Sequence, residues 1–128
     1  MTERAPETAE RPTILLVEDE PAVRRSMQLV LQGSGFAVRS YASGAAAVAD
    51  PEVGKARGLI ADFRLPEGDG LSVLRALRAA GFSGRAILVT AFPTMELEAN
   101  ARREGFLRVL PKPLTTRMLR EAMTDLSE

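Results

Sequence analysis

Short apolar runs alternate with longer amphipathic stretches along this chain, beginning at Thr13. The runs are rich in Ile, Leu and Val and are bounded by Gly, Pro or charged residues, a pattern typical of buried strands. Strands are therefore predicted over residues 13–17, 36–41, 58–61, 85–90 and 107–110.

The stretches between these runs carry apolar residues at helical spacing. In the first stretch, the apolar residues that share one stripe are Val23, Met27, Val30 and Leu31. Proline favours the first turn of a helix and glycine favours its end, so Pro21 and Gly33 bound this helix. Further helices are predicted over residues 43–49, from 71 to the residue before Gly81, over 94–103 and over 115–126.

This alternation of five strands with five helices predicts a doubly wound α/β domain. Parallel strands need crossover connections, and the crossover helices cover both faces of the sheet. The predicted domain spans residues 13–126, whereas residues 1–12 lack periodicity and are expected to form a flexible tail. Ligands of such sheets bind beyond the carboxyl ends of the strands, so the residues at those ends are the candidates for function.

Composition excludes several classes of protein. The 17 basic and 17 acidic residues cancel, so no direct contact with nucleic acid or with a membrane is expected. The chain has no histidine and no cysteine, which excludes Ser-His-Asp and Cys-His catalysis and histidine or thiolate metal sites. No apolar stretch has the length of a membrane span, and the charged amino terminus is unlike a signal peptide, so a cytoplasmic location is expected.

Polar residues stand at the carboxyl ends of four predicted strands. They are Glu18 and Asp19, then Asp62, Thr90 and Lys112. Three carboxylates at one edge repel one another unless a cation neutralises them, and hard oxygen ligands suit Mg²⁺. Mg²⁺ with a neighbouring lysine and threonine would also neutralise a phosphoryl group placed on one of the acids. The acid at the end of the central strand, Asp62, is the expected acceptor.

The same residues lie in four motifs that resemble the signatures of the receiver domain of two-component response regulators. The motifs are LLVEDE at 15–20, DFRLPEGDG at 62–70, TA at 90–91 and PKP at 111–113. They follow the order and spacing of that family over residues 13–126. The resemblance implies a flavodoxin-like sheet with strand order 2-1-3-4-5 and a cis peptide between Lys112 and Pro113.

By this resemblance, Asp62 is the phosphoacceptor, and Thr90 and Lys112 bind the phosphoryl oxygens. The implied Mg²⁺ ligands are Glu18, Asp19, Asp62 and the backbone carbonyl of Arg64. The implied function is a signalling switch, in which a sensor histidine kinase or a histidine phosphotransfer protein phosphorylates Asp62. The altered surface then changes partner binding or self-association. On this interpretation the protein is not an enzyme beyond Mg²⁺-dependent self-phosphorylation from a phosphodonor and autodephosphorylation.

Two positions depart from the family pattern. Val109 stands three residues before Lys112, where the family often has Tyr or Phe, so the usual aromatic switch is absent. Leu65 stands three residues after Asp62, where Met is common. That exchange conserves volume and is expected to be neutral.

Two other functions fit the predicted fold less well. A Mg²⁺-dependent phosphohydrolase with Asp62 as its nucleophile would want a second acid two residues later, where this chain has Arg64. A flavin or nucleotide site would want a glycine-rich loop after the first strand, where residues 18–21 are Glu-Asp-Glu-Pro.

Two surfaces leave their interpretation open. Mixed charges near the fifth strand and the last two helices form either a solvated surface or a homodimer face; they are Arg102, Arg103, Arg108, Arg117, Arg120, Glu96, Glu98, Glu104, Glu121 and Asp125. On the first helix, a strip of small or apolar residues is either plain surface or an edge for partner docking; it consists of Ala22, Ser26 and Leu29.

Overall fold

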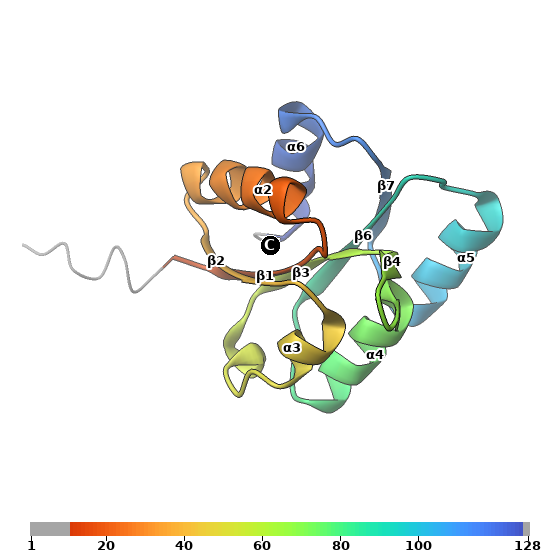
Figure 1. The fold of residues 1–128 in the computed structure, drawn as a ribbon, viewed down its shortest axis with the longest axis horizontal. Helices are drawn as coiled ribbons and strands as arrows, with labels where there is room; N and C mark the ends of the chain where they lie inside the picture. Colours follow the sequence, from red (N-terminus) through yellow and green to blue (C-terminus); the bar gives the residue numbers. More distant parts are fainter. Residues whose placement is uncertain (1–10, 127–128) are drawn as a thin grey trace, which may run out of the picture.

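A computed structural model of the chain describes residues 11–126, which form a parallel sheet between two layers of helices (Figure 1). The strands of this sheet are β1 (Thr13–Val17), β2 (Ala37–Tyr41), β3 (Gly58–Asp62), β6 (Arg85–Thr90) and β7 (Arg108–Pro111). They lie in the order β2-β1-β3-β6-β7, and all the pairs are parallel. Counted along the chain, this is the predicted order 2-1-3-4-5.

Helices connect the strands and lie on both faces of the sheet. They are α2 (Pro21–Gly33), α3 (Gly44–Val48), α4 (Gly70–Ala79), α5 (Met95–Glu104) and α6 (Thr116–Leu126). In Figure 1, α2 and α6 lie on one side of the sheet, and α3, α4 and α5 lie on the other. Side-chain oxygens of Ser43, Asp69 and Thr94 accept hydrogen bonds from the first turns of α3, α4 and α5. The doubly wound fold class is confirmed.

The strands are buried on both faces because alternate residues contact different helix layers. In β1, Leu15 and Val17 belong to the core shared with α3, α4 and α5. Ile14 and Leu16 belong to the core shared with α2 and α6. This two-sided burial explains why the strands read as unbroken apolar runs in the sequence.

Some local structure differs from the expectations drawn from the sequence. A 3-10 turn at Val53–Lys55 stands where a loop was expected, with Val53 buried. The loop expected over 63–70 contains two short antiparallel strands, β4 (Arg64–Leu65) and β5 (Gly68–Asp69). The last strand is shifted by one residue from the predicted range of 107–110. Most of the tail predicted for 1–12 lies outside the described residues.

Gly70 sets how closely α4 approaches the central strand. A Cβ at this position would lie 2.6 Å from the backbone oxygen of Asp62 and 2.6 Å from Cδ1 of Leu88. The amide of Gly70 also donates a 2.8 Å hydrogen bond to the carbonyl of Phe63. The absence of a side chain here therefore lets α4 start directly beside the end of β3, where Asp62 lies. Within residues 11–126, no helix has the length and apolar character needed to cross a membrane.

Candidate functional site

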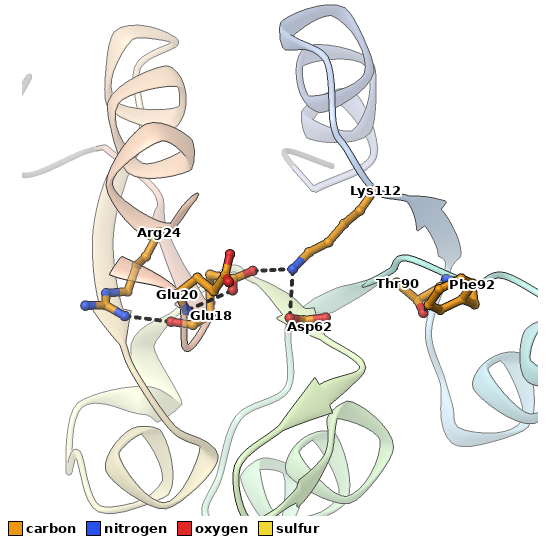
Figure 2. A network of polar contacts seen from close by, with 7 residues as sticks. All are labelled: Glu18, Glu20, Arg24, Asp62, Thr90, Phe92 and Lys112. Carbon is orange, nitrogen blue, oxygen red and sulfur yellow. Dashed lines mark hydrogen bonds and ion pairs between the residues drawn. The ribbon is translucent and has the colours of Figure 1, made fainter. Parts of the chain in front are cut away.

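The sheet brings the predicted polar residues together at one edge. Asp62 and Thr90 are the last residues of β3 and β6, and Lys112 directly follows β7. Glu18 directly follows β1, and Figure 2 shows its side chain on the same side as Asp62 and Lys112. Glu18, Asp62 and Thr90 are the buried polar residues of the described chain, while Asp19 is exposed.

Lys112 bridges two of the acids. Its Nζ lies 2.8 Å from Oδ2 of Asp62 and 2.9 Å from Oε1 of Glu18 (Figure 2). Burial disfavours the charged ammonium, but the hydrogen bonds to Asp62 and Glu18 outweigh it, so the pKa of Lys112 is raised. Lys112 therefore stays positively charged, beside the carboxyl ends of β3 and β7.

Glu18 is held at several atoms. Its Oε2 accepts a 3.0 Å hydrogen bond from the amide of Glu20, and its carbonyl accepts one of 2.8 Å from Nη1 of Arg24. Its own amide donates to the carbonyl of Tyr41 at 3.1 Å. Burial raises the pKa of the Glu18 carboxyl, although the bonds from Glu20 and Lys112 oppose that rise.

Three carboxylates form what we call the acidic rim, which consists of Glu18, Asp19 and Asp62. Each offers an oxygen, and these oxygens all lie within 4.8 Å of one another. Opposite ligands of an octahedral Mg²⁺ are roughly 4 Å apart, since each Mg–O bond is about 2.1 Å. Three carboxylates against the single ammonium of Lys112 leave negative charge in excess. The spacing, the oxygen chemistry and the charge of the acidic rim therefore fit a divalent cation.

Asp62 differs from Glu18 in that one of its oxygens is open. Lys112 binds Oδ2, whereas no donor within residues 11–126 is bonded to Oδ1. No fully buried side-chain oxygen of the described chain lacks a partner, so Oδ1 reaches solvent. An incoming electrophile therefore has access to an oxygen of Asp62.

Thr90 is connected to the loop that follows β6. Its hydroxyl accepts a 3.2 Å hydrogen bond from the amide of Phe92, whose side chain is 70% exposed. The hydroxyl hydrogen stays available for donation, because a hydroxyl has one donor and two acceptor positions. Val109, which stands in place of the frequent aromatic, is partly buried and packs against the core on the α3, α4 and α5 side.

Arg64 and Leu65 lie in the short strand β4. Arg64 is opposite Asp69, and in the neighbouring pair the amide of Gly70 donates a hydrogen bond to the carbonyl of Phe63. Bonded and non-bonded pairs alternate in antiparallel ladders, so the backbone carbonyl of Arg64 faces away from β5. Leu65 is buried in the core with residues of α3 and α4.

Two contacts at the site were missed in the sequence. Arg24 follows Glu18 by six residues, and this spacing from the acids carries no motif. The ion pair between Lys112 and Glu18 was not predicted either. The extra methylene of glutamate, which lets its carboxylate reach farther than that of an aspartate, was the feature that could have suggested it. The cis peptide expected between Lys112 and Pro113 is confirmed.

A groove of about 570 Å³ lies beside Lys112, between α2 and the start of α6. Apolar residues that line it include Val23, Val30, Leu114 and Leu119. From the strip singled out on α2, Ala22 and Ser26 line this groove, whereas Leu29 is exposed elsewhere on the helix.

Comparison with known proteins extends these observations. A model of the response regulator receiver domain family matches residues 14–124. The C4-dicarboxylate transport transcriptional regulatory protein DctD of Rhizobium meliloti is 32% identical over 102 residues, which cover 80% of this chain and 22% of DctD. The transcriptional regulatory protein FixJ of the same species is 28% identical over 116 residues, which cover 91% of this chain and 57% of FixJ.

The fold is also that of a solved structure. The chemotaxis protein CheY4 of Vibrio cholerae superposes with a TM-score of 0.83 at 21% identity, over 91% of this chain and 98% of CheY4. The chain thus spans only part of the two transcriptional regulators and nearly the whole of CheY4.

Proposed function

The chain belongs to the response regulator receiver domain family of two-component systems, and we propose that it works through phosphorylation of Asp62. The observation that carries the proposal is the position of Asp62. Asp62 is the last residue of the central strand, and its carboxylate lies beside Glu18 and Asp19, the other two acids of the rim. It binds Lys112 through Oδ2, while Oδ1 is open to solvent.

The proposed reaction is transfer of a phosphoryl group from a phosphohistidine of the partner. Oδ1 of Asp62 attacks phosphorus, a P–O bond forms, and the P–N bond breaks, so that its electron pair leaves with the imidazole. Mg²⁺ held by Glu18, Asp19, Asp62 and the carbonyl of Arg64 would supply positive charge to the carboxylate and phosphoryl oxygens. Lys112 donates to one phosphoryl oxygen, and the hydroxyl of Thr90 donates to another.

The phosphoryl donor is proposed to be a sensor histidine kinase or a histidine phosphotransfer protein. The 128 residues contain no histidine, so the phosphohistidine must lie outside them. The groove between α2 and α6 offers an apolar surface beside Lys112, where a partner helix would bring its histidine to the acidic rim. A cytoplasmic location and the lack of nucleic-acid and membrane contacts remain parts of this proposal.

Switching is proposed to run through Thr90 rather than through an aromatic at Val109. When Thr90 turns toward the phosphoryl group, its hydrogen bond with Phe92 carries the start of the loop before α5 along with it. The exposed face of α5, β7 and α6 then changes its binding to a partner or to a second copy. Part of the mixed charge on that face is used within the chain, because Arg108 pairs with Asp125 and Glu104 pairs with Arg75.

The test is phosphorylation by a small phosphodonor. Acetyl phosphate with Mg²⁺ should add one phosphoryl group to the wild-type protein, detected by mass spectrometry. The adduct should be lost in Asp62→Asn and in the presence of a chelator, because both the nucleophile and the cation are needed. Asp50→Asn, which changes an aspartate outside the rim, should retain it.

An undiminished adduct in Asp62→Asn would contradict the assignment of the acceptor. The phosphohydrolase alternative, which the comparisons do not favour, predicts a different outcome. It would require sustained release of inorganic phosphate from a phosphate monoester, with many turnovers for each protein molecule.

A further inference from the structure

We propose that Arg24 is a positioning residue that orients Glu18 and Asp19 and thereby sets the affinity of the acidic rim for a divalent cation. This inference rests on the Mg²⁺ site of the proposed function. It assigns a role to a residue that lies outside the four motifs and makes no contact with the phosphoacceptor.

The contact is between a side chain of α2 and the backbone of the preceding turn. Nη1 of Arg24 lies 2.8 Å from the carbonyl oxygen of Glu18, and Figure 2 shows the guanidinium on the far side of Glu18 from Lys112. The amide of Glu18 donates to Tyr41, the last residue of β2. Because β2 ends there, Arg24 supplies a donor at the point where the ladder of the sheet stops.

The carbonyl of Glu18 matters because of the peptide group to which it belongs. That planar group includes the amide nitrogen and, by geometry, the Cα of Asp19, so a fixed carbonyl direction fixes the starting point of Asp19. Asp19 is exposed, and no side-chain hydrogen bond holds it within the described chain. Its carboxylate therefore depends on the backbone of this turn for its place in the rim.

Arg24 acts on the other rim acid in the same turn. With the carbonyl of Glu18 held, Oε2 of Glu18 meets the amide of Glu20 at 3.0 Å, and Oε1 meets Lys112 at 2.9 Å. Loss of the guanidinium would let the turn between β1 and α2 rotate, and the preorganised spacing of the carboxylate oxygens would be lost. Groups that orient metal ligands in this way typically affect metal affinity strongly.

Charge and geometry predict opposite results, which makes the inference testable. A cation beside an acidic site repels Mg²⁺, so removal of Arg24 would tighten binding if only its charge mattered. If the orientation of the turn matters more, the same removal weakens binding. Arg25, the next residue of α2, is exposed and provides a control of equal charge and nearly equal position.

The experiment is a calorimetric titration of the folded protein with Mg²⁺. We expect Arg24→Met to weaken Mg²⁺ binding about 10-fold, at the lower end of effects seen for such supporting residues. Arg24→Lys, which keeps the charge and a donor, should recover part of the loss. Arg25→Met should bind Mg²⁺ as the wild type does or slightly more tightly.

A second measurement tests the order of the turn between β1 and α2 in the absence of metal. Hydrogen exchange of the Glu20 amide, which donates to the Glu18 carboxylate, should be faster in Arg24→Met than in Arg25→Met or the wild type. Unchanged or tighter Mg²⁺ binding in Arg24→Met would overturn the inference and leave the proposed function intact. Absence of Mg²⁺ binding in the wild type would instead overturn the proposed function, and this inference with it. If Arg24→Met does not fold, wild-type affinity and exchange rate in Arg24→Ala, which also lacks a donor, would overturn the inference equally.

Discussion

Two charged clusters lie on neighbouring strands of this sheet, and only one of them is saturated with partners. We call the second the edge cluster; it consists of Arg39, Tyr41 and Asp50. Oδ2 of Asp50 accepts from Nε of Arg39 at 2.8 Å and from the hydroxyl of Tyr41 at 2.5 Å. Oδ1 accepts from the amide of Glu52 at 2.8 Å. One carboxylate there meets three donors.

The acidic rim shows the reverse balance. Three carboxylates share the ammonium of Lys112, and Oδ1 of Asp62 has no bonded donor within residues 11–126. A saturated cluster needs nothing from solution and stabilises the fold. An unsaturated cluster, held in place by a rigid sheet, stores repulsion that a cation or a phosphoryl group relieves. The contrast therefore distinguishes a structural cluster from a ligand site within one sheet.

The largest expected difference between the two clusters is their response to Mg²⁺. Binding to the folded state alone should stabilise the wild-type protein by about 2.7 kcal/mol when Mg²⁺ is 100-fold above its dissociation constant. Asp19→Ala should lose most of this increment because it removes a ligand and a negative charge. The measurement is urea unfolding with and without Mg²⁺.

Tyr41→Phe provides the matching change in the edge cluster. It should lower the stability of the protein in both conditions and leave the Mg²⁺ increment as it is. An equal increment in Asp19→Ala and the wild type would mean that the acids of the rim do not bind the metal together.

A smaller change is expected in the stability of the fold at low pH, and it should come from the edge cluster. The bonds from Tyr41, Arg39 and the amide of Glu52 lower the pKa of Asp50 from 3.8 to about 2. Because the folded-state pKa lies below the unfolded value, this stabilisation is present above about pH 4 and is lost as the pH falls toward 2.

Unfolding by urea at pH 5 and pH 3 should reveal this loss as a difference between variants. The wild type should exceed Asp50→Asn in stability at pH 5, and the gap should narrow at pH 3. Other carboxyl groups titrate in both proteins and cancel in the comparison. A gap that stays constant across this range would show that the charge of Asp50 contributes nothing.

The smallest expected effect is a gain in stability. In the presence of a chelator, Asp19→Ala should stabilise the protein by a few tenths of a kcal/mol, since one of three repelling charges is removed at an exposed position. High salt should shrink this gain because it screens exposed charges. A loss of stability instead would indicate that Asp19 supports the turn rather than repelling its neighbours.

The main elements of the fold were predictable because burial leaves a direct mark on the sequence. β1, β3 and β6 are covered on both faces, so their apolar runs are unbroken, and the site residues stand where those runs stop. The pairing of β4 with β5 was not predictable. Two-residue strands carry no periodicity, and their position depends on how closely Gly70 lets α4 approach Asp62.

The site was predictable as a set of residue types but not as a set of contacts. The rim acids, Thr90 and Lys112 stand in motifs, whereas Arg24 acts on a backbone oxygen, which leaves no pattern of side chains. The edge cluster was missed for a related reason. Arg39 and Tyr41 lie on the same face of β2, but their partner Asp50 follows a helix whose direction only the folded chain reveals.

The bridge made by Lys112 also has a consequence for the order of events during synthesis. Glu18 follows the first strand and Lys112 follows the last, with Asp62 50 residues before it. A nascent chain that has emerged only through β6 carries all three acids without the ammonium that balances them. Such a chain would offer a poor acceptor. If Asp62 is the phosphoacceptor, as proposed above, phosphorylation would therefore be confined to molecules whose last strand has joined the sheet.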